Sequence, residues 1–200
     1  MTSTSILFTE YLQTKAGITK EQLLVLNNAI QTKTVQKGEL LLRQGEICNH
    51  SFFVEKGLLR SYTIDTLGKE HIIQFASESW IISDRSSIFF NEPSDFYIDA
   101  IEETTVILLD QNFINLACEI SVSFRLFNDR ALQNHIRHLQ KRINLLLGAS
   151  AEERYLDFIK LYPDMLLRVP QWMIASYLGI TPESLSRVRK ELAKRNFKPY

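Results

Sequence analysis

The sequence predicts an α+β protein in which an antiparallel β-barrel or sandwich is followed by a long helix and a C-terminal helix-turn-helix. Three patterns support this prediction: glycines at regular intervals in the first half, a heptad-spaced apolar row near residue 140, and a helical hairpin motif near residue 180. The 200 residues are 45% hydrophobic and 23% charged. This composition suffices for one or two packed domains and excludes a disordered or fibrous chain.

The first expected elements are short helices and a set of β-strands. Apolar residues recur at helical intervals from about residue 6 to 30. Gly38, Gly45, Gly57 and Gly68 then follow one another at intervals of 7, 12 and 11 residues, a spacing typical of turns in an antiparallel barrel or sandwich. Strands are expected where branched and aromatic residues cluster between these turns, over 40–42, 52–55, 58–64, 71–75, 80–82, 96–101 and 104–109.

A row of apolar residues predicts one long helix over 119–148. Its members are spaced 4, 3, 4 and 3 residues apart, like the a and d positions of a heptad: Leu132, Ile136, Leu139, Ile143 and Leu146. Basic side chains flank this narrow row, which favours the interface of a two-helix homodimer over burial in the helix's own domain, the alternative reading. Gly148 is expected to end the helix, and a capping box of Ser150 and Glu153 to begin the next.

The segment 171–190 has the pattern of a helix-turn-helix. Ala175 is small where the two helices would cross, and Gly179 supplies the left-handed turn that ends the first helix. Thr181 suits the N-cap of the second helix and Pro182 suits its first turn. The second helix would present a polar and basic face to the major groove of double-stranded DNA. The predicted DNA-binding residues are Thr181, Glu183, Ser184, Ser186, Arg187, Arg189, Lys190 and Lys194.

The charge distribution agrees with a nucleic-acid partner for the C-terminal half. Residues 1–110 hold 9 basic and 15 acidic side chains, a net charge of −6, whereas residues 111–200 hold 14 and 8, a net charge of +6. Within 168–200 the count is 7 basic against 2 acidic, a net charge of +5 in 33 residues. A solvated helix face gives the same pattern, but such a surface is what phosphate binding requires.

Taken together, these segments resemble bacterial transcription regulators of the Crp/Fnr type. The resemblance rests on Leu-Gly-Ile-Thr-Pro-Glu-Ser-Leu-Ser-Arg-Val-Arg-Lys at 178–190, the long helix, and the turns within 37–46 and 52–57. It implies a jelly-roll sensor domain related to cyclic-nucleotide-binding domains over 1–118, a dimerisation helix over 119–148, and a winged helix-turn-helix domain over 149–200.

The same resemblance implies a homodimer on a pseudo-palindromic DNA site, with RNA polymerase as a further partner. Glu183 and Arg187 occupy the positions from which the family reads base edges, while Pro182 replaces an arginine that is frequent there. The operator sequence is therefore not predicted. Few residues follow the second helix, so any wing is expected around 166–169.

The residues that hold a cyclic nucleotide in this family are replaced here. A Gly-Glu pair that binds the ribose aligns with Ser83-Asp84, and an Arg-Ser or Arg-Thr pair that binds the phosphate aligns with Ser94-Asp95. Carboxylates at these places, with Asp99 beside them, would repel a cyclic phosphate, and Arg85 is the one cation expected nearby. We therefore expect no control by cyclic AMP or GMP and an unknown effector. The degenerate effector pocket consists of Ser83, Asp84, Arg85, Ser94 and Asp95.

Other sequence features argue against cofactors, membranes and catalysis. Cys48 and Cys118 are too few for a disulfide framework or a four-cysteine metal site, so no cofactor and no metal is expected. No apolar stretch could span a bilayer and no basic leader begins the chain, so the expected location is the cytoplasm. No enzyme motif is present. Two alternatives remain: a ligand-binding signalling module whose helix-turn-helix contacts proteins, and a cupin-like metalloenzyme with candidate ligands Glu46, His50, Glu70 and His71.

Overall fold

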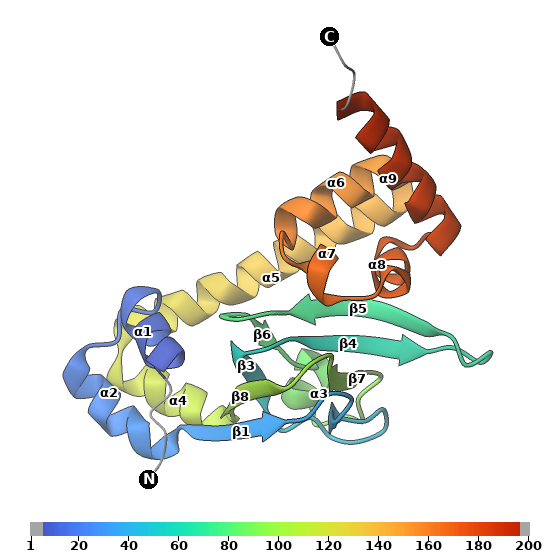
Figure 1. Cartoon of the computed structure of the whole chain (residues 1–200). Helices are drawn as coiled ribbons and strands as arrows, with labels where there is room; N and C mark the ends of the chain where they lie inside the picture. The colour runs from blue at the N-terminus through green and yellow to red at the C-terminus, as the bar shows by residue number, and fades with distance from the viewer. Residues whose placement is uncertain (1–5, 197–200) are drawn as a thin grey trace.

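The protein, described here over residues 6–196 by a computed structural model, begins with helices, continues as a β-roll and ends with helices (Figure 1). The N-terminal part contains α1 (Ile6–Thr14), α2 (Lys20–Leu26) and a 3-10 turn, η1 (Asn27–Ala29). Thr19 caps α2 through a capping box with Gln22. Phe8 packs on Phe53 and Phe113, so α1 covers one end of the roll.

Two four-stranded antiparallel sheets form the roll, which confirms the predicted architecture. One sheet has the order β1-β8-β3-β6 and the other β2-β7-β4-β5. Their strands are β1 (Gln31–Val35), β2 (Leu40–Leu42), β3 (Ser51–Lys56), β4 (Leu59–Ile64), β5 (Glu70–Ala76), β6 (Ile81–Ile82), β7 (Tyr97–Ala100) and β8 (Thr104–Leu109). Apolar side chains fill the space between the sheets, among them Phe52, Val54, Ile98 and Val106.

The predicted glycine turns are present, and Gly57 shows why one of them must be glycine. Its φ is +100°, and an added Cβ would lie 2.5 Å from Oγ1 of Thr104 and 2.6 Å from the carbonyl oxygen of Glu103. The turn between β3 and β4 therefore has no room for any side chain.

α3 (Arg85–Phe90) lies between β6 and β7 within the roll, whereas α4 (Gln111–Ile120) and α5 (Val122–Gly148) connect the roll to the C-terminal part. α5 is the predicted long helix; Ser121 caps its first turn. α5 ends at Gly148, as expected, although Gly148 does not adopt a left-handed conformation. Gly148 is the last helical residue, and Ala149 leaves the helix in an extended conformation.

The remaining helices are α6 (Ala151–Leu161), α7 (Met165–Arg168), α8 (Gln171–Leu178) and α9 (Pro182–Asn196). The predicted capping box of Ser150 and Glu153 begins α6. The wing expected around 166–169 is wrong, because these residues form α7 and the extended residue that follows it. No strand follows β8 within residues 6–196.

The C-terminal helices pack on the outer side of the β4–β5 hairpin (Figure 1). Phe75 of β5, Phe158 of α6, Tyr162 just after α6, and Tyr177 of α8 form one buried aromatic cluster with ring centroids 5.3–6.3 Å apart. The roll and the helix-turn-helix thus share a core, which fixes the position of α9 relative to the roll.

Candidate nucleic-acid interface and effector site

The turn between α8 and α9 has the geometry expected from its sequence. Gly179 adopts φ +65° and its amide donates to carbonyl oxygens at the end of α8. The backbone nitrogen of Ser184 donates to Oγ1 of Thr181 over 3.2 Å, so Thr181 is the N-cap of α9. Ala175 is 1% exposed. The local chemistry therefore fixes the angle at which α9 leaves the turn.

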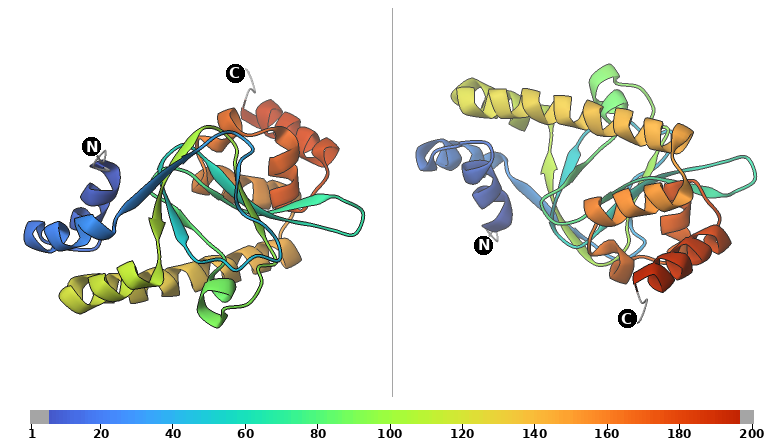
Figure 2. Two further views of the ribbon diagram at one scale, coloured as in Figure 1. Left: turned by 90° about the horizontal axis from the view of Figure 1, so that it is seen from below. Right: turned by 90° about the horizontal axis from the view of Figure 1, so that it is seen from above.

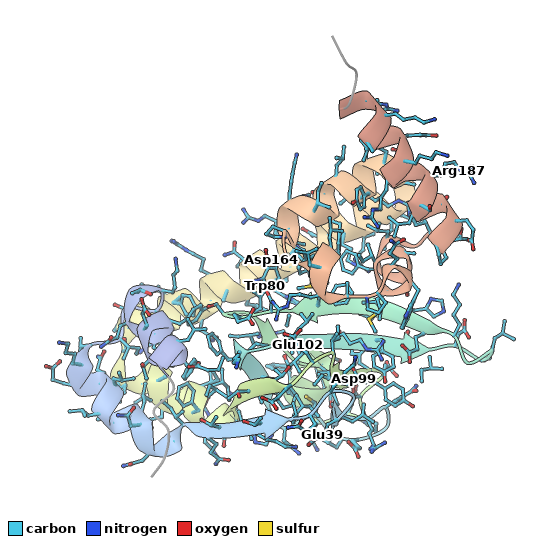
Figure 3. The ribbon with its side chains drawn as sticks, viewed as in Figure 1. Glu39, Trp80, Asp99, Glu102, Asp164 and Arg187 are labelled. Atoms are coloured by element: carbon cyan, nitrogen blue, oxygen red, sulfur yellow. The ribbon has the colours of Figure 1, made fainter. Side chains whose placement is uncertain are left out.

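α9 presents most of the predicted DNA-binding residues to solvent. Its apolar side is buried through Leu185 and Val188. Figure 3 shows Arg187 extending away from the rest of the protein. Ser184 and Arg189 are half-buried, not fully exposed as the sequence suggested, because they border the buried side. The exposed members of the set are Thr181, Glu183, Ser186, Arg187, Lys190 and Lys194.

The basic groups on α9 are largely uncompensated. α9 contains five basic and two acidic residues, a net charge of +3. Arg195 pairs with Glu152 of α6 over 2.6 Å. Among the residues that the structure describes, no ion pair joins Arg187, Arg189, Lys190 or Lys194 to an acidic group. These four cations remain available to a polyanion.

Glu183 lies in the first turn of α9. Hydrogen bonds from its own backbone amide and from the hydroxyl of Thr181 lower the pKa of its carboxyl below the ordinary value. At neutral pH Glu183 is therefore a charged acceptor at the start of the helix. A carboxylate is able to accept a hydrogen bond from the exocyclic amine of cytosine.

α8 is anchored to the roll through the free edge of β5. Oγ of Ser176 accepts a hydrogen bond from the nitrogen of Ile72 over 3.0 Å and donates to the carbonyl oxygen of Glu70 over 3.1 Å. Nη2 of Arg142 on α5 donates to the carbonyl oxygens of Ile72 and Tyr177, and its guanidinium lies 3.6 Å from the centre of the Tyr177 ring. Side chains of α5 and α8 thus satisfy backbone groups that an edge strand otherwise leaves open.

A second anchor is formed by Arg168 of α7. Its guanidinium forks to both carboxylate oxygens of Glu78, at 2.8 and 3.0 Å, and also contacts Glu102 at 2.5 Å. Hydrogen bonds to Glu78 raise the pKa of Arg168 further above its ordinary value. Arg168 was predicted to be part of the basic C-terminal region. In the structure its charge is instead neutralised by Glu78 and Glu102 of the roll.

The heptad row predicted on α5 is exposed on one side of the helix. Ile136, Leu139, Ile143 and Leu146 remain 39–54% exposed, and Leu132 is half-buried. The residues that face the chain's own body lie between them: His135, His138, Arg142 and Leu145 are half-buried. An apolar row that adjoins a packed face and stays partly exposed is a surface that a further partner can cover.

In the degenerate effector pocket, the buried residues are hydrogen-bonded to one another and to α3. Asp84 is buried, caps α3 by accepting from the nitrogen of Ser87, and accepts from Oγ of Ser94 over 2.7 Å. The carboxylate of Asp84 and the hydroxyl of Ser94 therefore form a hydrogen bond with each other inside the protein. Ser83 is half-buried, whereas Arg85 and Asp95 are exposed.

Asp99 does not lie where the sequence analysis expected it. Its neighbours Ile98 and Ala100 point into the roll, so Asp99 points out, into a cleft of about 410 Å³ between the roll and α7–α8. Arg60 of β4 binds both its oxygens, at 2.7 and 2.9 Å. Burial opposes the charge of Arg60, but Asp99 and Glu70 outweigh it and raise the pKa of Arg60. Sequence analysis missed Arg60 and named Arg85 as the one nearby cation.

The candidate metal ligands Glu46, His50, Glu70 and His71 do not form a cluster in the structure. Within residues 6–196, no group of three or more His, Cys, Asp or Glu side chains could hold a metal ion. His71 instead contacts Asp65 at the β4–β5 turn, and this hydrogen bond lowers the pKa of Asp65 to about 2. The cupin-like alternative therefore lacks its ligand cluster.

None of the helices between residues 6 and 196 combines the length and apolar character needed to cross a membrane.

Comparison with known proteins finds a family match within the roll and relatives that extend over most of the chain. Residues 32–120 match the cyclic nucleotide-binding domain family. The anaerobic regulatory protein of Pasteurella multocida is 26% identical over 189 residues, which are 88% of this chain and 68% of that protein. The fumarate and nitrate reduction regulatory protein of Yersinia pestis is 26% identical over 183 residues, 86% of this chain and 72% of that protein.

Solved structures share the fold from the roll to the helix-turn-helix. FixK2 from Bradyrhizobium japonicum superposes with a TM-score of 0.70 at 22% identity, covering 86% of this chain and 88% of that one. A variant of CooA from Carboxydothermus hydrogenoformans superposes with a TM-score of 0.67 at 22% identity, covering 86% and 79%.

Proposed function

We propose that this chain reads a pseudo-palindromic operator as a homodimer. The premise is that it is a DNA-binding transcriptional regulator of the Crp/Fnr type. Two copies of α9 related by a two-fold axis would enter successive major grooves about 34 Å apart. The observation that carries this proposal is the exposed, unpaired basic face of α9 on a helix whose angle is set by the turn.

The predicted DNA-binding residues divide into two roles. Arg187 and Glu183 are placed to read base edges, because a guanidinium can bind guanine in two places and a carboxylate accepts from cytosine. Positioning on the phosphates falls to Thr181, Ser184, Ser186, Arg189, Lys190 and Lys194. We propose no catalytic role for any of them.

The homodimer would form through the exposed row on α5, with Leu132, Ile136, Leu139, Ile143 and Leu146 facing the same residues of the second copy. In this arrangement residues 1–118 form the sensor domain, 119–148 the dimerisation helix and 149–200 the DNA-binding domain. Contact with RNA polymerase and a place in the bacterial cytoplasm follow from the proposed role in transcription.

We further propose that cyclic AMP and GMP do not control this regulator. Ser94, which aligns with the phosphate-binding pair, is already hydrogen-bonded to buried Asp84, and within residues 6–196 no ion pair involves Asp84. A cyclic phosphate would have to break this bond and lie beside a carboxylate. Isothermal titration calorimetry with millimolar cyclic nucleotide should give no saturable heat. Saturation would overturn the proposal.

Fluorescence anisotropy tests the proposed function. A labelled duplex selected from random DNA and its scrambled version are titrated with protein at several salt concentrations. We expect tighter binding to the selected duplex and a steep loss of affinity with salt, because phosphate contacts release counterions. Equal, salt-independent affinity for both duplexes would support the alternative in which the helix-turn-helix contacts proteins.

A further inference from the structure

Helix α3 buries Ser87 and turns its two phenylalanines, Phe89 and Phe90, outward. Ser87 is 1% exposed, whereas Phe89 is 81% exposed and Phe90 63%. The two rings contact each other edge to face at a centroid distance of 5.0 Å. Water favours the opposite arrangement, so an outward aromatic pair indicates a surface that another apolar surface covers.

α3 holds this pair in a fixed position. Oγ of Ser87 accepts from the nitrogen of Cys48 over 2.8 Å and donates to the carbonyl oxygen of Glu92 over 2.6 Å. Asp84 caps the start of the helix, and Asn91 ends it in a left-handed conformation. Because both ends of α3 are tied to the roll, covering the two rings would order little additional chain.

The position of α3 relative to α5 determines what can cover it. Figure 2 shows α3 in green beside α5 in yellow, at the outer edge of the molecule in both views, with α3 projecting beyond α5. The charge of Arg85 contributes, after burial, to the lowered pKa of His135, which places the start of α3 near the middle of α5. Because α3 lies beside α5, the exposed phenylalanines adjoin the surface that a partner of α5 would cover.

We propose that Phe89 and Phe90 bind the middle of α5 of a second copy of this chain and form part of the dimer interface. This inference rests on the proposed pairing of α5 helices, in which two-fold symmetry brings the partner's α5 to the height of α3. The segment between β6 and β7, which includes the effector-pocket residues, would then serve subunit contact. The contact would be made by Phe89 and Phe90, which are not among the effector-pocket residues.

The area available supports a second copy as the occupant. A stable interface buries about 800 Å² per partner, more than four partly exposed side chains of the α5 row supply. A phenylalanine can bury about 150–250 Å², so the exposed fractions of Phe89 and Phe90 add about 200–350 Å² per chain. The pair thus supplies a substantial part of the apolar area that the dimer needs.

Sedimentation equilibrium of the full chain tests this inference with three variants. Phe89→Ser with Phe90→Ser should weaken dimerisation tenfold or more and leave the far-ultraviolet circular dichroism unchanged. Leu67→Ser, at a residue 92% exposed on the β4–β5 turn, is the matched control and should leave dimerisation unchanged. Ile143→Lys tests the α5 row itself. Unchanged dimerisation in the double phenylalanine variant would overturn the inference, and loss only in Ile143→Lys would leave the proposed α5 pairing standing.

Photo-crosslinking gives a second, independent readout. A benzophenone amino acid replaces Phe89 in a mixture of ¹⁴N- and ¹⁵N-labelled chains, and the adducts are located by mass spectrometry. We expect mixed-isotope adducts within residues 126–139 of the other chain. Adducts confined to single-isotope pairs within one chain would contradict the inference.

Discussion

The hydroxyl of Ser176 on α8 bridges two backbone groups of β5, the nitrogen of Ile72 and the carbonyl oxygen of Glu70. This single side chain joins the first helix of the helix-turn-helix to the edge strand of the β2-β7-β4-β5 sheet. Residues more than one hundred positions apart in the chain are thereby fixed relative to one another, and with them the direction of α9.

Ser176→Ala should destabilise the protein by about 1–3 kcal/mol, because it leaves two partly buried backbone groups without their partner. Urea denaturation followed by circular dichroism measures the change. Ser186→Ala is the matched control, since Ser186 is exposed on α9 and should change the free energy of unfolding by less than about 0.5 kcal/mol. Equal effects of the two substitutions would contradict the anchoring role of Ser176.

Gly57→Ala should destabilise the roll by about 3 kcal/mol or more, because the added Cβ would collide with the backbone of residues 103 and 104. Gly68→Ala is the control. Gly68 also has a positive φ, of +79°, but open space surrounds it, so only backbone strain of about 1 kcal/mol is expected. Thermal unfolding of both variants separates the collision from the strain.

Arg187→Ala should cost about 1–3 kcal/mol on the selected operator and relax its sequence preference at the bases that Arg187 contacts. Lys194→Ala should weaken binding to every sequence alike and reduce the salt slope by about one. Anisotropy titrations against operator and scrambled duplexes measure both effects. Equal losses on both duplexes for Arg187→Ala would show that Arg187 contacts phosphates only.

Stability should decline with acid through His135 and His138. Burial and then the charge of Arg85 lower the pKa of His135, and burial and then Arg142 lower that of His138, below the unfolded value of 6.5. The unfolded chain therefore binds more protons than the folded one as the pH falls below about 6.5, and stability present above that pH is lost. NMR titration of the imidazoles should give midpoints below 6.5. Midpoints at or above 6.5 would contradict this assignment.

The helix-turn-helix and the turns of the roll could be predicted because each depends on a few residues that are neighbours in the sequence. The helix-turn-helix follows from Gly179, Thr181 and Pro182, and the turns of the roll follow from its glycines. β1 was missed because four of its five residues are exposed and polar or hydroxylated residues dominate it. α3 was missed because it spans only six residues, and its cap, Asp84, was interpreted as part of a ligand pocket.

Long-range relationships could not be predicted from the sequence. Arg60 lies on a buried strand and its partner Asp99 is 39 positions away, so no local pattern connects them. The same holds for Arg168, whose partners Glu78 and Glu102 lie on the roll. These ion pairs lie where the roll meets the C-terminal helices. The partners come together only when the chain is folded, so the sequence does not reveal them.

The central claim is that two chains present α9 to two successive major grooves. Hydroxyl-radical footprinting of the selected operator, combined with sedimentation of the complex, tests it most directly. The account predicts two chains per duplex and two symmetry-related protected segments whose centres lie about 34 Å apart. One chain per duplex, or a single protected segment, would contradict it.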